Sequence, residues 1–266
     1  MLGKLLKYEV RATARTFVPL YALLIIFALI NKAFISINSD NLKIPLIISG
    51  SVFAIIIIAI CVMTLVVTIQ RFYKNLLSDE GYLMFTLPVK AHSHIISKLL
   101  VSMLWSFLSA IVSGFAILLM AANPKSMSEL SKFMADCADG INKVGFPAYV
   151  IIIEGIVLVL ISVAGSIVTI YAAMAIGNLS GKHRVLLSLG AYIGFGTIEQ
   201  IVATIILFAF PKNWEIYFDN VTQYNYMPAV SAAQLFMLGM IIFTMIFGVA
   251  YYVLTNWLLK KKLNLE

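Results

Sequence analysis

Charged residues are scarce in this 266-residue chain: Asp, Glu, Lys and Arg make up 12% of it, whereas apolar residues make up 62%. A soluble domain carries about 25% charged and roughly 45–50% apolar residues. So few charges cannot keep a folded surface in water, which excludes a soluble enzyme. The two cysteines, Cys61 and Cys137, are too few for a disulfide framework, and we expect both to be free thiols.

Motifs of intramembrane catalysis are also missing, because the chain has no His-Glu-x-x-His and no Gly-x-Ser-x-Gly on any apolar run. The nearest lookalike of a phosphate-binding loop, residues 177–183, has three residues between its glycines instead of four, and His where Ser or Thr would coordinate magnesium. His92 and His94 form at most a weak metal site, without a cysteine or carboxylate cluster beside them. We therefore expect no enzyme activity, no metal site and no cofactor on this chain.

Long apolar runs dominate what is present. A helix needs about 20 apolar residues to cross a hydrocarbon core of roughly 30 Å. Barrel strands would be shorter and would alternate in polarity, which these runs do not. The sequence therefore predicts an all-α integral membrane protein, with residues 1–266 as one transmembrane domain. Its six expected spans are residues 17–37, 44–69, 95–121, 147–176, 185–210 and 231–259.

The basic residues indicate the orientation of the spans. Six spans place both termini on one side of the membrane. Thirteen of the 19 basic residues lie in or next to the terminal and even-numbered connections, and six lie in or next to the odd-numbered ones. Basic residues stay on the cytoplasmic side, so we expect both termini in the cytoplasm and the chain in the cell membrane. The net charge of +7 then reflects topology, and no nucleic-acid partner is expected.

Residues 1–16 have a helical charge pattern, which predicts an amphipathic helix in the cytoplasmic interface. Its leucine side would face lipid, and its basic side would face anionic headgroups or a partner. A simple topology anchor and a protein-docking helix remain equally open. Glu9 lies on the leucine side and therefore needs a basic partner. The basic stripe, at three- and four-residue spacing, consists of Lys4, Lys7, Arg11 and Arg15.

Residues 70–94 connect the second and third spans on the expected cytoplasmic side. Ser78, followed by two acids, resembles a helix start, and Pro88 would stop that helix. Bulky apolar side chains at residues 82–85 are costly on a loop unless something covers them. They either lie on the membrane surface or insert into a cytoplasmic partner.

Two acids, Glu154 and Glu199, lie well inside predicted spans. A charge at such a depth costs at least about 2.5–3.5 kcal/mol, so each should face the bundle interior or a wet cavity, or be protonated. Glu154 heads a face that continues through Ser162 and Thr169, which could line a translocation path or a helix contact. For both acids, a cationic or proton-linked substrate and a structural hydrogen bond between helices remain open.

The order of these features resembles the permease subunit of a type 2 ATP-binding-cassette (ABC) exporter, in the short form of Gram-positive bacteria. The resemblance covers the whole chain in layout. It comprises a basic amphipathic helix, two spans, the loop Ser-Asp-Glu-Gly-Tyr-Leu-Met-Phe-Thr-Leu-Pro-Val at residues 78–89, and four further spans. Its most specific part is Asp-Glu-Gly-Tyr-Leu with Thr-Leu-Pro.

That resemblance implies roles for several segments. Residues 1–16 would be the connecting helix, and residues 211–230 would form short re-entrant helices on the outer side. The loop after the second span would be the coupling helix, docked in a groove of the ATPase. Its expected contacts are Ser78, Asp79, Glu80, Tyr82, Leu83 and Phe85.

The resemblance also implies partners: two ATPase subunits, which would carry ATP and magnesium, and a second permease, identical or related. The substrate would be hydrophobic or amphipathic, such as a drug or an antimicrobial peptide, moving along a path beside Glu199 and Glu154. Two other functions stay open. The chain could be an ion-coupled secondary transporter that uses Glu199, or a non-transporting membrane scaffold or sensor subunit.

Overall fold

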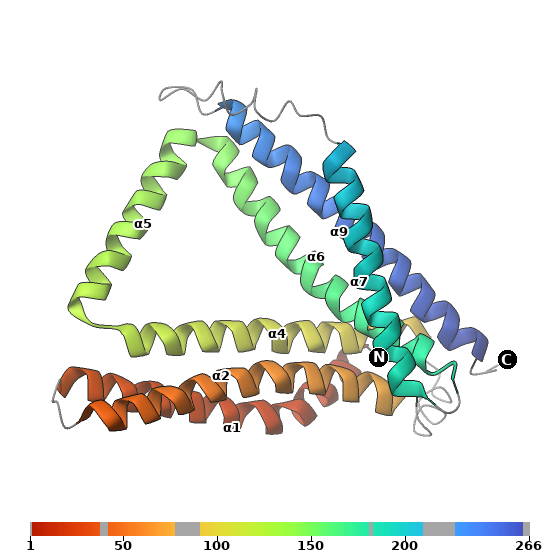
Figure 1. The fold of residues 1–266 in the computed structure, drawn as a ribbon, viewed down its shortest axis with the longest axis horizontal. Coiled ribbons are helices and arrows are strands. Elements are labelled where there is room, and N and C mark those ends of the chain that lie inside the picture. Colours follow the sequence, from red (N-terminus) through yellow and green to blue (C-terminus); the bar gives the residue numbers. More distant parts are fainter. Residues whose placement is uncertain (1, 38–41, 78–90, 181–182, 210–226, 263–266) are drawn as a thin grey trace. The chain divides into compact units, whose positions relative to one another are not determined.

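The computed structural model describes residues 2–37, 42–77, 91–180, 183–209 and 227–262. These residues form seven α-helices and one π-helical turn, which are labelled in Figure 1 where there is room. In chain order they are α1 (Leu2–Ile37), α2 (Lys43–Phe72), the π-helical turn η2 (Tyr73–Leu77), α4 (Ala91–Ala121), α5 (Pro124–Val144), α6 (Phe146–Gly177), α7 (Arg184–Ala209) and α9 (Met227–Lys262).

Six of these helices are long and apolar enough to cross a membrane: α1, α2, α4, α6, α7 and α9. They coincide with the six predicted spans, which confirms an all-helical chain with the composition of a multi-pass membrane protein. Their outward faces carry apolar side chains such as Ile47, Ile58 and Ile111, each more than 60% exposed. A bilayer is the solvent that such faces require.

The N-terminal segment differs from the prediction of a separate interfacial helix. Residues 2–37 form a single α-helix, so the amphipathic stretch continues directly into the first span. Leu6 and Val10 are partly buried and pack against the core of the neighbouring helices. The reason is that α1 joins α2 and α4 along its length, so its apolar side meets protein.

The connection between the third and fourth predicted spans contains a further helix, α5. Asn123 caps α5 by accepting a hydrogen bond from the Ser126 amide at 2.8 Å, and Pro124 occupies its first position. Gly145 ends it with φ +73°, a conformation that residues with a side chain rarely adopt. These Asn-Pro and Gly signals were readable in the sequence.

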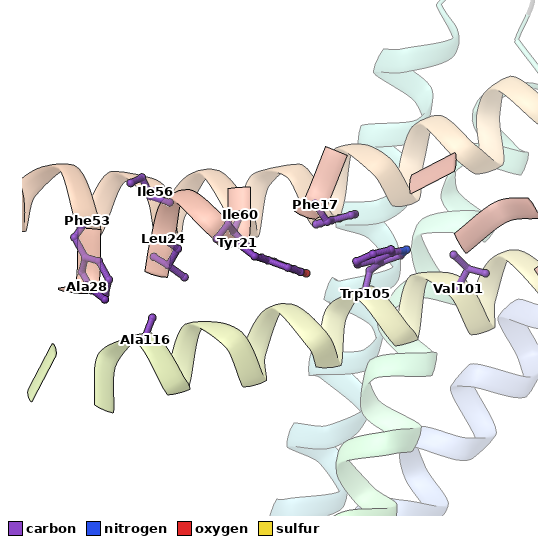
Figure 2. Packing of buried hydrophobic residues seen from close by; sticks show 10 residues of the cluster. All are labelled: Phe17, Tyr21, Leu24, Ala28, Phe53, Ile56, Ile60, Val101, Trp105 and Ala116. Carbon is purple, nitrogen blue, oxygen red and sulfur yellow. The ribbon is translucent and has the colours of Figure 1, made fainter. Parts of the chain in front are cut away.

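The chain divides into two compact units, residues 1–133 and 134–266. In the first unit, α1, α2 and α4 pack side by side (Figure 1). Figure 2 shows the apolar side chains between them, which come from all three helices. Phe17, Leu24 and Ala28 of α1 are fully buried there.

In the second unit, α6 packs against both α7 and α9. Small residues allow the close approach: Gly248 of α9 lies against the backbone of Gly165, and Thr244 is next to the same glycine. Tyr171 and Ala172 of α6 are fully buried. Close backbone contact through small residues is a common way for helices to associate in lipid.

We predict that Gly177→Ala will destabilise the second unit by about 1–3 kcal/mol, the usual cost of overpacking. A Cβ at position 177 would collide with the Ser188 side chain and lie 2.6 Å from the Arg184 carbonyl oxygen. Unfolding of the purified chain in detergent would measure the change. Gly190→Ala is the matched control, because nothing lies within 4 Å of its Cβ, and equal effects of the two substitutions would contradict this packing.

Candidate functional site

One face of α1 carries a polar or aromatic side chain at nearly every turn, and each contacts α2 or α4. Tyr21 shares a 2.7 Å hydrogen bond with Ser109 of α4. Asn31, which is fully buried, accepts a 2.9 Å hydrogen bond from Ser49 of α2. Glu9, Thr13, Phe17 and Tyr21 follow one another at four-residue intervals, and Asn31 is five full turns after Thr13, so these side chains form one stripe. This stripe begins at Glu9, where the contacts become ionic.

Glu9, Arg71 and Lys98 form an ion-pair cluster that joins three helices. Arg71 Nη1 of α2 donates to Glu9 Oε2 at 2.8 Å, and Lys98 Nζ of α4 donates to Glu9 Oε1 at 3.0 Å. The two carboxylate oxygens therefore pair with cations from different helices. The Lys98 side chain is 3% exposed and that of Glu9 11%, so water screens the Lys98–Glu9 pair weakly.

One turn further along α1, Thr13 continues the connection to α4. Its hydroxyl donates to the Glu9 carbonyl oxygen at 2.8 Å and accepts a hydrogen bond from Trp105 Nε1 at 2.7 Å. The Trp105 ring stacks on Phe17, with centroids 4.5 Å apart (Figure 2). The Trp105 indole thus has both a hydrogen-bond partner and an aromatic neighbour, which fixes its orientation.

The ion-pair cluster joins α2 and α4 near the helix ends that precede and follow residues 78–90 in the sequence. Arg71 is seven residues before Ser78, and Lys98 is eight residues after Lys90. Between Arg71 and Ser78, Phe72 and Leu76 are fully buried in the first unit. Both helices that flank residues 78–90 are therefore fixed to α1 close to where that segment begins and ends.

The cluster makes strong contacts between helices. A carboxylate paired with two cations makes charge-assisted hydrogen bonds, which are short and directional. Among the described residues, no group of three or more His, Cys, Asp or Glu side chains could hold a metal ion. Cys61 and Cys137 are exposed and free.

The outcome for residues 1–16 is mixed. The prediction that Glu9 needs a basic partner is confirmed, since it has two. The side chains of Lys7, Arg11 and Arg15 are exposed, while nothing is described for the Lys4 side chain. The sequence reading missed Lys98 and Trp105. A lysine four residues into an apolar span was the available signal, because such a charge needs a partner.

The residues expected to contact an ATPase lie outside the described residues: Ser78, Asp79, Glu80, Tyr82, Leu83 and Phe85. Of the loop 70–94, residues 70–77 are helical and residues 91–94 begin α4. Of the expected re-entrant segment 211–230, residues 227–230 belong to α9, and the rest is not described.

The acids inside the spans are both in the second unit. Glu154 of α6 is partly buried, and its Oε2 has no hydrogen-bond partner among the described residues. Glu199 of α7 lies next to Tyr251 of α9, whose buried hydroxyl makes no hydrogen bond of good geometry within the described part of the chain. The Tyr251 ring packs on Phe195, one turn before Glu199, at 4.5 Å between centroids.

The face that begins at Glu154 contributes to helix packing at several positions. Gly165 and Ala172 face neighbouring helices, as described above. Thr169 is partly buried, and its hydroxyl donates to the Gly165 carbonyl oxygen at 2.9 Å. Ser162 is exposed. The role of Glu154, Ser162, Thr169 and Glu199 in a translocation path stays a prediction.

Comparison with known proteins adds no relative: no protein-family model, curated protein or solved structure matches the chain.

We predict that Glu9→Gln will destabilise the first unit by about 3–5 kcal/mol, because it leaves the buried Lys98 ammonium without its counter-charge. Adding Lys98→Met removes that charge, so the double variant should be less destabilised than the sum of the single variants. Unfolding in detergent would give the coupling energy.

A second cycle serves as comparison, pairing Glu9→Gln with Arg71→Gln. The Arg71 side chain is 27% exposed, so its coupling to Glu9 should be smaller than that of Lys98. Glu129→Gln, on an exposed helix, should change stability by less than about 0.5 kcal/mol. Additive effects of Glu9→Gln and Lys98→Met would show that the carboxylate does not stabilise the buried ammonium.

Proposed function

We propose that this chain is the membrane-spanning permease subunit of an ATP-driven ABC exporter, with both termini in the cytoplasm. The observation that carries the proposal is the ion-pair cluster between the helices that precede and follow residues 78–90 in the sequence. A transporter driven by a separate ATPase must receive motion through a short segment and pass it to several helices. The cluster connects α2 and α4, on the two sides of that segment, to α1.

The same contacts suggest how motion would be transmitted. ATP binding would bring two ATPase subunits together and displace residues 78–90. Because Glu9 joins α2 to α4 through α1, the three helices would move as one body. Thr13, Trp105 and Tyr21 extend that body toward the membrane interior. The path would thereby change from inward to outward access, and the permease needs no catalytic residue for this step.

The proposal includes the partners and the substrate class. Two permeases, identical or related, would pair with two ATPase subunits that hold ATP and magnesium. The six apolar helices and their few polar groups suit a hydrophobic or amphipathic substrate. Drugs and antimicrobial peptides belong to this class. The resemblance of residues 78–89 to the coupling loop of type 2 exporters supports the assignment independently of the ion-pair cluster.

Docking of the chain to its ATPase is tested by co-expressing the two proteins. The ATPase is the one encoded by an adjacent reading frame with an intact Gly-x-x-x-x-Gly-Lys-Ser/Thr loop. We predict that Glu80→Ala combined with Tyr82→Ala will lower co-purification of that ATPase at least about tenfold, a loss of about 1.4 kcal/mol or more in binding free energy. Quantitative gel staining of the affinity-purified chain measures the ratio.

The matched control is Glu129→Ala combined with Phe133→Ala. This pair also removes one acid and one aromatic ring, but from α5, which follows the third span and therefore lies on the other side of the membrane. It should leave co-purification unchanged. Wild-type amounts of ATPase on the Glu80 and Tyr82 variant would place the docking surface elsewhere.

An ion-coupled transporter is the second candidate function, and the second unit favours it. Glu199 lies near the Tyr251 hydroxyl, and Glu154 has a buried carboxylate oxygen that makes no hydrogen bond to any described residue. Acids in such surroundings are common in proton relays. Under the exporter proposal, the same acids would meet a cationic substrate. Transport in sealed vesicles without ATP, driven by a proton gradient alone, would favour the second candidate.

We predict that Glu199→Gln will lower transport of an amphipathic cation such as ethidium at least about tenfold, equivalent to about 1.4 kcal/mol. It should leave the amount of assembled complex unchanged, because glutamine keeps the shape of the side chain and removes only its charge. Fluorescence of ethidium in inside-out vesicles measures the rate. Glu154→Gln is the comparison, and unchanged transport in the Glu199 variant would remove that acid from the path.

A further inference from the structure

Helix α5 carries its apolar and its charged side chains on different sides. At 3.6 residues per turn, its bulky apolar side chains fall within an arc of about 120°. All six charged side chains fall within an arc of about 80°, centred about 140° away. The apolar set is Met127, Leu130, Phe133, Met134, Cys137, Ile141 and Val144.

Neither unit, taken by itself, covers the part of this apolar face that belongs to it. No residue of α5 is buried, and the Phe133 and Met134 side chains are 65% and 63% exposed. An exposed stripe of this size is costly in water. Either lipid or another protein has to cover it.

The short linkers at both ends of α5 favour lipid over another protein as the cover of its apolar face. Two residues, 122 and 123, join α5 to α4, and only Gly145 joins it to α6. Both neighbours are membrane-spanning helices, so both ends of α5 are attached to the same membrane surface. An upright α5 of 21 residues would carry one end about 31 Å away from that surface. A linker of one or two residues spans less than about 10 Å and cannot bridge such a height.

The adjoining ends of the two spans offer little length outside the lipid. The last turns of α4 carry Ile117 and Leu118, and the first turns of α6 carry Phe146 and Tyr149, all exposed and bulky. These side chains favour immersion of both helices up to the linkers. The titratable residues of α4, His92, His94 and Lys98, are at its opposite end.

We propose that α5 lies flat on the membrane surface, with its apolar face in the lipid and its charged face in water. Large amphipathicity with low overall hydrophobicity is typical of helices in the interface. The polar face carries three lysines and three acids, so its net charge is zero and apolar insertion holds the helix. Anionic lipid is therefore not required. This inference does not depend on the proposed transport function.

Spin-label accessibility tests the proposal on the full chain in phosphatidylcholine vesicles. In a background carrying Cys61→Ala and Cys137→Ala, Met134→Cys and Ile141→Cys place a nitroxide on the apolar face. Lys132→Cys and Asp136→Cys place it on the charged face as matched controls. Oxygen concentrates in lipid and a neutral nickel chelate in water. We expect the ratio of oxygen to nickel accessibility to be at least about fivefold higher for labels on the apolar face.

Each other outcome overturns the proposal. High nickel accessibility on both faces would mean that α5 stands in water, and low accessibility to both reagents at Met134 and Ile141 would mean that protein covers the face. A large increase in the difference on adding phosphatidylglycerol would mean that anionic headgroups, and not apolar insertion, hold the helix. Circular dichroism of each labelled chain verifies that it is still folded.

Discussion

Backbone groups that cross a bilayer have to be hydrogen-bonded inside their own segment, because the hydrocarbon offers no other partner. This constraint makes each span of the chain a helix, and it changes what holds the helices together. Lipid tails are as apolar as Leu and Ile side chains, so burying such side chains between helices gains little. Association then depends on polar contacts and on close packing of backbones.

The two units of the chain meet this requirement in different ways. In the first unit, α1 contacts α2 and α4 through Glu9, Thr13, Tyr21 and Asn31, a stripe of ion pairs and hydrogen bonds. In the second unit, α6 approaches α9 at Gly165 and α7 at Gly177, where small residues let backbones come close. The first unit contains the ion-pair cluster, which joins the helices that precede and follow residues 78–90 in the sequence. A body joined by directional bonds is well suited to move as a whole, which is what the proposed function requires of it.

Much of the fold followed from composition and periodicity, and the reason is physical. Apolar length determines a membrane span locally, so five of the six predicted spans agree with the observed apolar segments to within three residues at both ends, whereas the first observed segment starts at Leu6 instead of residue 17. Charge placement likewise showed that Glu9 needed a basic partner, because an acid on an apolar side has to be neutralised. The helix α5 was missed although its cap signals were present. The reason is that a search for long apolar runs does not detect a polar amphipathic helix. Neither Arg71 nor Lys98 was identified as the partner, because both are more than 60 residues from Glu9 in sequence.

By itself, the amino-acid sequence determined the helical class, the six apolar segments and the absence of recognisable catalytic motifs, all of which depend on local composition and spacing. Only the tertiary structure decided that α1 is one continuous helix packed against protein. It also decided that the Glu9 carboxylate joins α2 and α4, and that α6 contacts α9 at Gly165. These features depend on which faces meet in space. Periodicity defines a face, but only the packing of helices far apart in sequence selects its neighbour.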